Sequence, residues 1–380
     1  MTRASDTAKL LGAGGSILGS LDIGGGQIGG RRNIIINGAM QVAQRSVSVT
    51  GIGGSNGYFT VDRFHIGKGD TAGRLTMTQT ADGPSGFANC IKLDCTTADT
   101  SVAAGELLWL EQRIEGQDLQ QFKKGTSDAE QYSVSFYVKG NANATYALAL
   151  HDTDNSRHIV KLFSVTTAWT RITMTFPADT TGAFGDDNAH SLSVKIWLHA
   201  GSTYTSGTLQ SSAWASITAA NRAAGITSFF DSTDRTFFLT GLQLEVGSVA
   251  TPFEHRSFGE ELALCQRYHY RIVGNEVNNA SDGGFGIATN WDTNTFFTTL
   301  DFPVQMRAGP SLSFGAALSD FLILSTGATA EPTGISLNGA SKQRCEMNFQ
   351  KSGGFGTAGF SGWLRIVDNT NGFIAFDSEL

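Results

Sequence analysis

Aromatic residues with polar neighbours are the part of this sequence best suited to chemistry. Trp197 and His199 lie on the polar side of an alternating segment, and Tyr204 follows soon after. Trp169 and Trp214 lie near the ends of other predicted strands. Aromatic rings can stack on the apolar C–H face of a pyranose while planar polar groups bind its hydroxyls, so we predict a glycan-binding site at these residues. The alternative is that Trp197 covers its own domain or meets a neighbouring subunit, because aromatic residues are also enriched at protein interfaces.

Acidic pairs suggest one further kind of site. Asp152 with Asp154, and Asp186 with Asp187, are candidate ligands for a structural calcium ion, with a solvated turn as the alternative. An EF-hand is excluded because the position that should hold its final glutamate, counted from Asp152, holds Phe163. The histidines form neither HxxxH nor HExxH spacing, so we predict no zinc centre and no other cofactor.

Catalytic patterns are weak. Glycoside cleavage needs two carboxyl groups about 5–9.5 Å apart, and cross-strand polar pairing is a simpler account of Glu111 and Glu245. Residues 24–29 match GxGxxG, but a strand rather than a helix is expected after them. Residues 53–57 match GxSxG, but they lie in a Gly-rich loop rather than at a strand-to-helix turn. We therefore predict that the chain is not an enzyme.

The composition favours β-structure and excludes two classes of partner. Only 16% of the residues are charged and 46 of the 380 are Gly, whereas about 25% charged residues is usual. The net charge of −7 gives no electrostatic basis for binding a phosphate backbone, so we predict no nucleic-acid partner. No apolar run approaches the roughly 18 residues of a membrane helix, so we predict no membrane insertion. The four cysteines lack CxxC spacing and are expected to be reduced and mostly buried.

Short strands separated by Gly, Asn, Asp and Ser clusters dominate most of the chain. Apolar and polar residues alternate, as in half-buried strands, in four segments: 132–139, 170–176, 192–198 and 237–246. In the last segment, the row that holds Leu242 is expected to continue through Thr240 and Phe238. Residues 147–150 and 158–165 flank an Asx-rich turn and indicate a hairpin. These features predict an all-β fold built on a jelly-roll β-sandwich.

Four regions are predicted along the chain. Residues 1–31 form a Gly-rich anchoring arm, because nine of the nineteen positions from 12 to 30 are Gly. Residues 32–256 form the jelly-roll, carbohydrate-binding-like domain. Residues 257–270 form a short connecting helix that opens with capping-box spacing, and residues 271–380 form a second small β-sandwich domain.

Four strings, in this order, resemble a module that recurs in tail-fibre and other appendage proteins of tailed bacteriophages. They are NIIINGAMQVAQR at 33–45, YFTVDRF at 58–64, GLQLEVGS and ATPFE within 241–254, and LALCQRY at 262–268. Residues 104–254 also look like the jelly-roll carbohydrate-binding modules of bacterial hydrolases. The ending FDSEL resembles the usual close of such phage proteins.

The polar residues of these strings are expected to be structural. Charge-assisted hydrogen bonds among them would pin strands and tie the sandwich to its helix. They are Gln44, Arg45, Asp62, Arg63, Gln243, Glu245, Glu254, Gln266 and Arg267.

The resemblance implies a structural protein of the virion. It implies a homotrimeric tail fibre whose arm binds other virion proteins and whose β-domains attach the particle to host-surface polysaccharide. Such a protein is assembled in the host cytoplasm and is located on the tail or another surface appendage of the virion. Two alternatives stay open: a capsid or tail decoration protein without receptor binding, and a tail-spike depolymerase.

Overall fold

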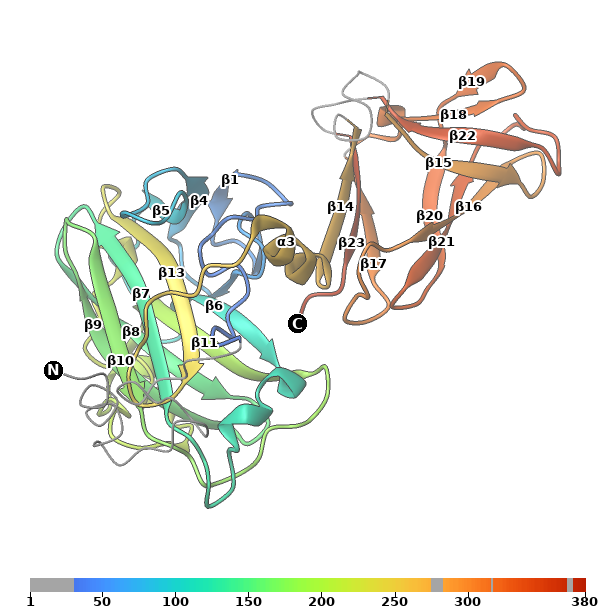
Figure 1. The fold of residues 1–380 in the computed structure, drawn as a ribbon. Helices are drawn as coiled ribbons and strands as arrows, with labels where there is room; N and C mark the ends of the chain where they lie inside the picture. The colour runs from blue at the N-terminus through green and yellow to red at the C-terminus, as the bar shows by residue number, and fades with distance from the viewer. Residues whose placement is uncertain (1–30, 275–282, 316, 368–371) are drawn as a thin grey trace, which may run out of the picture. The chain divides into compact units, whose positions relative to one another are not determined.

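The computed structural model describes residues 31–274, 283–315, 317–367 and 372–380, shown as a coloured ribbon in Figure 1. Contacts divide the chain into two units, Met1–Ser257 together with Leu380, and Phe258–Glu379. The arm predicted at 1–31 lies outside the described residues except for Arg31. Both units are built mainly from strands, which confirms the predicted all-β class.

Two antiparallel sheets enclose the core of the first unit. The six-stranded sheet has the order β1 (Ser48–Ile52), β4 (Arg74–Thr80), β5 (Cys90–Thr97), β13 (Thr236–Val246), β7 (Tyr132–Gly140) and β10 (Thr170–Phe176). The seven-stranded sheet has the order β12 (Ala215–Ser216), β9 (Arg157–Val165), β8 (Ala144–Asp152), β11 (His190–Ala200), β6 (Leu107–Glu115), β3 (His65–Gly69) and β2 (Gly57–Tyr58). Apolar side chains from both sheets form one buried cluster, as in the predicted jelly-roll sandwich.

The alternation predicted from sequence is confirmed in three strands. Phe136 of β7, Met174 of β10 and Ile196 of β11 all face the shared core. The predicted hairpin is also present, because β8 and β9 pair antiparallel along their whole length. In each case the residues between these apolar ones face the other side of the sheet, because side chains alternate along a strand.

A bulge at Gly241 makes the fourth prediction wrong. The pairing of β13 with β7 shifts register there, and Gly241 has a φ of 63°, a left-handed conformation that favours glycine. One extra residue in a strand reverses the faces beyond it. Leu239 therefore faces the core together with Leu242, whereas Phe238 and Thr240 do not belong to the core cluster.

The first motif network is buried. Asp62 is fully buried and accepts a hydrogen bond from the backbone nitrogen of Gln44 at 3.1 Å. A guanidinium nitrogen of Arg45 lies 3.6 Å from the same carboxylate. Arg63 donates to the carbonyl oxygen of Arg113 in β6 at 2.6 Å. These contacts link loop residues of the two motif strings to one another and to β6, and the structural role of the motif residues stays a prediction.

A second network involves the residues after β13. Gln243 donates to Glu245 at 2.8 Å, and its side-chain oxygen accepts the backbone N–H of Glu254, also at 2.8 Å. Glu254 accepts hydrogen bonds from the backbone nitrogens of residues 32–33. These contacts fix the first described residues against the sandwich. The expected tie from Glu254 to the helix would join the two units and stays a prediction.

The helix that opens the second unit is shorter than predicted. α3 spans Phe258–Gln266, and β14 (His269–Val273) begins two residues after Arg267, so the prediction that the helix reaches residue 270 is wrong. The carbonyl of Arg267 accepts the backbone N–H of Arg307 at 2.8 Å. No helix among the described residues is long and apolar enough to span a membrane.

The second unit has two sheets around its own core. The three-stranded sheet has the order β14, β23 (Phe373–Asp377) and β17 (Ser311–Phe314). The seven-stranded sheet has the order β19 (Ala328–Ala330), β18 (Phe321–Ser325), β22 (Ser361–Ile366), β15 (Gly283–Asn290), β16 (Thr295–Asp301), β21 (Arg344–Gln350) and β20 (Gly334–Ala340). Residues of both sheets, including Phe296 and Phe376, share one buried cluster. The predicted second β-domain is therefore present.

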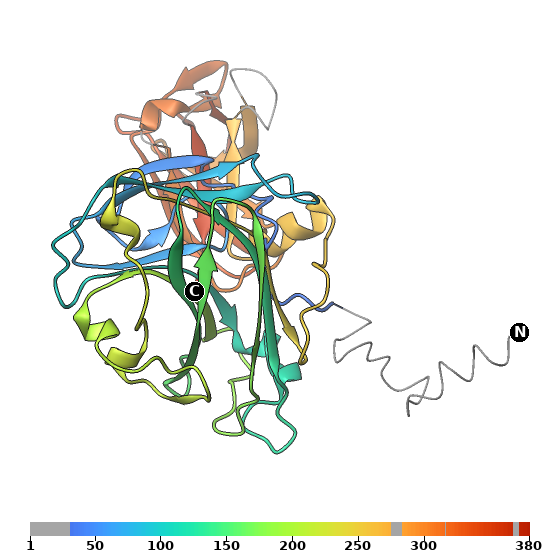
Figure 2. The ribbon, with the colours of Figure 1, turned by 90° about the vertical axis from the view of Figure 1, so that its left-hand side faces the viewer.

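Short helical turns occupy several loops. Those of the first unit are η1 (Gly116–Asp118), η2 (Gln120–Phe122), α2 (Ser202–Thr205), η3 (Ala219–Asn221) and η4 (Phe229–Asp231), and the second unit has η5 (Leu318–Asp320). The turns between residues 201 and 231 are yellow-green in Figure 2.

All four cysteines are free and buried, as predicted. Burial raises the pKa of Cys90, Cys95 and Cys345 to about 11, so these thiols stay protonated at neutral pH.

A buried ion cluster joins two loops of the first unit to the hairpin of β8 and β9. The Nζ of Lys124 lies 2.6 Å from Asp152 and 3.2 Å from Asp179, and all three side chains are buried. Arg157 also pairs with Asp179, at 2.8 Å. The ammonium of Lys124 thus places a positive charge beside Asp152, and calcium binding by Asp152 and Asp154 stays a prediction. Asp154 accepts the backbone N–H of residue 185 at 2.9 Å.

Replacing Lys124 by Met should lower the free energy of unfolding by about 3–5 kcal/mol, because two buried carboxylates lose a shared partner. Urea unfolding at neutral pH measures this change. Lys123→Met is the matched control, since Lys123 is exposed and pairs with the exposed Glu130. Equal losses in the two variants would contradict the assignment of a buried cluster.

Candidate functional site

The seven-stranded sheet of the first unit carries chemistry-bearing residues on the side away from the core, here called the outer face. Cross-strand register arranges them in three rows, because residues opposite each other on neighbouring strands share a face. The rows are Trp197, Trp109 and Gly67; Lys195, Glu111 and His65; and His151, Ser193 and Arg113. The intervening residues of the same strands, such as Leu110 and Ile196, face the core.

The first row is aromatic. The rings of Trp109 and Trp197 meet edge to face, with centroids 5.0 Å apart. Gly67 makes room for Trp109, because a Cβ at this glycine would lie 2.1 Å from the indole nitrogen. Tyr204 contacts the other side of Trp197, with centroids 5.5 Å apart. The three rings therefore form one aromatic group on the outer face.

The segment between β11 and η4 covers part of this face. Tyr204, Leu209 and Ile226 from this segment pack with Trp197 and with the small residue Ala147 of β8. Trp197 is fully buried as a result, whereas Trp109 is only partly buried. The prediction that Trp197 lies opposite the apolar row is confirmed, but the prediction that it is an exposed platform is wrong. Trp109 is the ring that remains partly exposed at the edge of the cover.

Arg222 lies over the aromatic group. Its guanidinium carbon is 4.9 Å from the ring centre of Trp197, 5.8 Å from that of Tyr204 and 6.0 Å from that of Trp109. Arg222 is partly buried, and burial lowers its pKa. Across the described part of the chain, no carboxylate forms an ion pair with this guanidinium. The partly desolvated guanidinium of Arg222 is thus stabilised, among the described residues, by cation–π contacts with three rings.

Glu111 organises the second row. Its carboxylate is buried and lies 3.1 Å from His65 Nδ1, 3.0 Å from Arg113 and 3.2 Å from Lys195 Nζ. Burial by itself raises the pKa of Glu111, but the hydrogen bond from His65 and the charges of Lys195 and Arg113 together hold that pKa well below its usual value. Glu111 is therefore ionised at neutral pH.

Lys195 links the ionic and aromatic rows. Burial lowers its pKa, and the charge of Glu111 opposes that shift. Its Nζ lies 4.1 Å from the ring centre of Trp109. At the other end of the face, a carboxyl oxygen of Leu380, the last residue described, accepts a hydrogen bond from Arg113. Lys195 and Arg113 therefore both pair with Glu111, and Arg222 lies over the neighbouring rings.

The other aromatic residues predicted for the site lie elsewhere. His199 is fully buried and contacts Glu106 at 3.2 Å and Ser228 at 2.8 Å. Trp214 is part of the sandwich core, and its indole nitrogen donates to a backbone carbonyl at 2.9 Å. Trp169 lies beside Lys139 on the six-stranded sheet. The prediction of one site containing all five residues is wrong. Trp214 packs in the core, Trp169 lies beside the six-stranded sheet and His199 is buried against Glu106.

His199 belongs to a different cluster of potential metal ligands. Its ring nitrogen and the carboxylates of Asp99 and Glu106 bring ligand atoms within 4.8 Å of one another, and all three residues are buried. Asp99 already accepts hydrogen bonds from Thr71 Oγ1 and a backbone N–H, both at 2.8 Å. Hydrogen bonds to neighbouring residues thus satisfy this cluster. Asp186 and Asp187 are exposed in a loop, and their calcium binding stays a prediction.

Sequence reasoning interpreted Glu111 as part of a cross-strand polar pair, and it missed Trp109 and Arg222 on the outer face. The alternation of Trp109, Glu111 and Arg113 along one strand was the available signal, because residues two apart share a face. Arg222 lies in an irregular segment and offers no such periodicity. The structure brings it to Trp109 through the folding of the segment over the sheet.

Neutral histidines on and near this face make the first unit sensitive to acid. Burial, followed by nearby cations, lowers the pKa of His151 to about 3 and that of His158 to about 4. Burial also lowers the pKa of His190 to about 4. An unfolded histidine titrates near 6.5. Between these values the unfolded chain binds more protons, so stability present above pH 6.5 is lost as the pH falls.

We expect His151→Gln to reduce this pH dependence while keeping an acceptor for Lys195. Each such histidine contributes up to about 1.4 kcal/mol per pH unit between its two pKa values. Unfolding free energies measured in urea between about pH 7 and pH 5 give the slope. A variant whose slope equals that of the unaltered protein would show that His151 is not held neutral by the fold.

The comparisons with known proteins are limited to folds. No family model matches the sequence, and no curated protein matches it. Among solved structures, the chain is similar to the enzymatically active domain of tailspike protein 4 of bacteriophage CBA120, at 11% identity and a TM-score of 0.29, over 56% of this chain and 21% of that one. It is similar to a CBM4 structure at 11% identity and a TM-score of 0.29, over 55% of this chain and 97% of that one. It is also similar to TmCBM61 in complex with β-1,4-galactotriose, at 10% identity and a TM-score of 0.29, over 57% of this chain and 99% of that one. With values this low, the assignment of a jelly-roll sandwich comes from the strands and core of the chain itself.

Proposed function

We propose that the first unit binds an acidic saccharide on its outer face, and that the chain serves as a glycan-attachment protein of a bacteriophage particle. The observation that carries the binding proposal is Arg222, which lies over three aromatic rings with no ion-paired carboxylate among the described residues. A guanidinium can bind a carboxylate through two parallel hydrogen bonds. A uronate or similar acidic sugar supplies that carboxylate.

The aromatic and ionic rows have complementary roles in this proposal. Trp109 offers a ring for the apolar face of the sugar, and Arg222 offers charged donors beside it, while the buried Lys195 adds positive charge close to the ring. Binding an anion offsets the cost of keeping the partly desolvated Arg222 charged. Glu111 keeps Lys195 in position without matching the total positive charge of the face. The protein as a whole is negative, at −7, so this local excess of cations favours acidic ligands over neutral ones.

Glycoside cleavage is disfavoured on this face. A glycosidase needs a general acid whose pKa is raised, together with a second carboxyl group facing it. The pKa of Glu111 is well below its usual value, and Glu111 is the single carboxylate in the three rows. We therefore propose binding without catalysis and do not favour a depolymerase.

The virion role is supported by the motif strings rather than by the outer face. Their resemblance to phage appendage proteins favours a homotrimeric tail fibre, joined to other virion proteins through the arm at 1–31 and located at the particle surface. Several copies on one particle multiply weak individual contacts into useful avidity. A shallow site in each subunit is sufficient for attachment to host polysaccharide.

Arg222→Gln should weaken binding to an acidic polysaccharide by about 10- to 100-fold, since a hydrogen bond to a charged group contributes about 1.5–3 kcal/mol. Affinity electrophoresis of the full chain in gels containing polygalacturonate measures this effect, with neutral dextran as the comparison polymer. Raising the salt concentration should also weaken binding.

Arg344→Gln is the matched control, because Arg344 is an exposed arginine of the second unit that pairs with Asp301. It should bind as the unaltered protein does. If the folded, unaltered protein does not bind polygalacturonate, or if Arg222→Gln binds it equally well, the acidic-saccharide site is excluded. A decoration protein without receptor binding would then be favoured.

A further inference from the structure

The second unit exposes aromatic and apolar side chains on its seven-stranded sheet. Trp363 of β22 is 57% exposed, and Ile287, its register partner on β15, is 67% exposed. Trp363 also pairs in register with Leu324 of β18, the strand on the other edge of β22. Their neighbours along the strands, such as Leu364 and Ile323, fill the core. Neighbouring exposed apolar side chains on a regular sheet are a feature of interaction sites.

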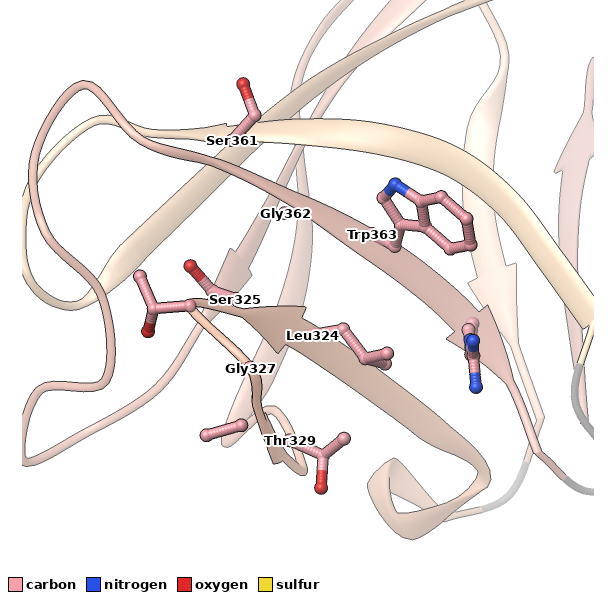
Figure 3. Close-up of a pocket in the computed structure, with 10 residues that line it drawn as sticks. Leu324, Ser325, Gly327, Thr329, Ser361, Gly362 and Trp363 are labelled. Carbon is pink, nitrogen blue, oxygen red and sulfur yellow. The ribbon is translucent and has the colours of Figure 1, made fainter.

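A cavity lies beside this indole. It has a volume of about 360 Å³ and is lined by the end of β18, the turn into β19, the start of β19 and residues of β22 as far as Arg365. This volume lies within the range of about 300–1,000 Å³ that is typical of ligand pockets. Figure 3 shows the indole of Trp363 and the side chain of Leu324 on neighbouring strands, with Thr329 on the adjoining hairpin strand. An aromatic ring, an aliphatic side chain and a hydroxyl thus border one space.

The turn that forms one wall has a defined backbone. Thr326 and Gly327 have φ values of 53° and 82°, the left-handed conformation at both central positions of a tight hairpin turn. A β-branched residue rarely adopts a positive φ, and such conformations persist where the surrounding structure fixes them. The wall is therefore preformed, which lowers the ordering cost of binding a ligand.

The lining favours a ligand with one apolar face and several hydroxyls. Thr329 and Ser361 supply hydroxyl groups, and Arg365, whose guanidinium carbon lies 5.9 Å from the ring centre of Trp363, supplies N–H donors. Among the described residues that line the cavity, none is acidic and Arg365 is the one cation. A pyranose matches this combination, because its C–H face stacks on an indole while its hydroxyls meet polar groups at the edge.

We propose that the second unit carries a separate binding site for a neutral pyranose residue of a glycan, with Trp363 as its stacking platform. This site goes beyond the acidic-saccharide site of the first unit and does not depend on it. The two sites differ in chemistry, since the outer face holds Lys195, Arg113 and Arg222 together with Glu111, whereas Arg365 is the one charged residue among the described residues that line this cavity. One chain then binds both an acidic sugar and a neutral pyranose of a polysaccharide.

The test uses the full chain and an array of neutral oligosaccharides built from glucose, galactose and mannose, followed by calorimetry on the strongest binder. We expect Trp363→Ala to weaken that binding at least about tenfold, the loss of a stacked ring being worth about 1–1.5 kcal/mol or more. Trp363→Phe should retain part of the affinity because it keeps an aromatic face. Trp363 is exposed, so both variants should fold.

Two control variants separate this site from the rest of the chain. Trp291→Ala removes another exposed indole, one that does not line the cavity, and should leave neutral-sugar binding unchanged. Arg222→Gln should also leave it unchanged, so failure of the first-unit site and failure of this one are distinguishable. Absence of binding to every neutral oligosaccharide, or equal binding by Trp363→Ala, overturns the proposal. A fall in the mass of the assembled protein on Trp363→Ala, measured by light scattering, would instead identify the surface as a contact between copies.

Discussion

The pairing of β6 with β11 is the constraint on which the outer face depends. That register places Trp109 opposite Trp197 and Glu111 opposite Lys195 on the side away from the core. Because strand side chains alternate with a period of two, a one-residue slip would turn all of these residues toward the core. The apolar residues between them fill the sandwich core. The register that packs the core therefore also fixes the arrangement of the charged rows.

The charged residues of this face form two groups. In one group the charges are paired, and in the other a guanidinium has no paired carboxylate among the described residues. Glu111 neutralises part of the charge around it and stays ionised because its cationic neighbours outweigh the effect of burial. Arg222 is held over the rings without such a carboxylate within the described residues. A ligand that brings a carboxylate completes the second group without disturbing the first. This difference is the physical basis for favouring an acidic sugar.

The sequence was sufficient for the sandwich but not for the site. Period-two alternation places Ile196 in the core and Trp197 on the opposite side, as the structure has them. It does not reveal that the segment after β11 folds back and buries Trp197, because this segment has irregular backbone and its sequence carries no periodic pattern. It also does not reveal the bulge at Gly241, which depends on pairing with β7. Sequence reasoning missed Arg222 because this residue lies in the irregular segment after β11.

The most direct test of the central claim is to observe the indole N–H signals of the full chain by NMR during titration with an oligogalacturonate. The indole nitrogen of Trp109 is buried beside Gly67 with no hydrogen-bond partner among the described atoms, so its signal reports on this part of the outer face. The account predicts that the Trp109 signal shifts saturably while that of the core residue Trp214 does not. Saturable shifts that leave the Trp109 signal unchanged would contradict binding on the outer face.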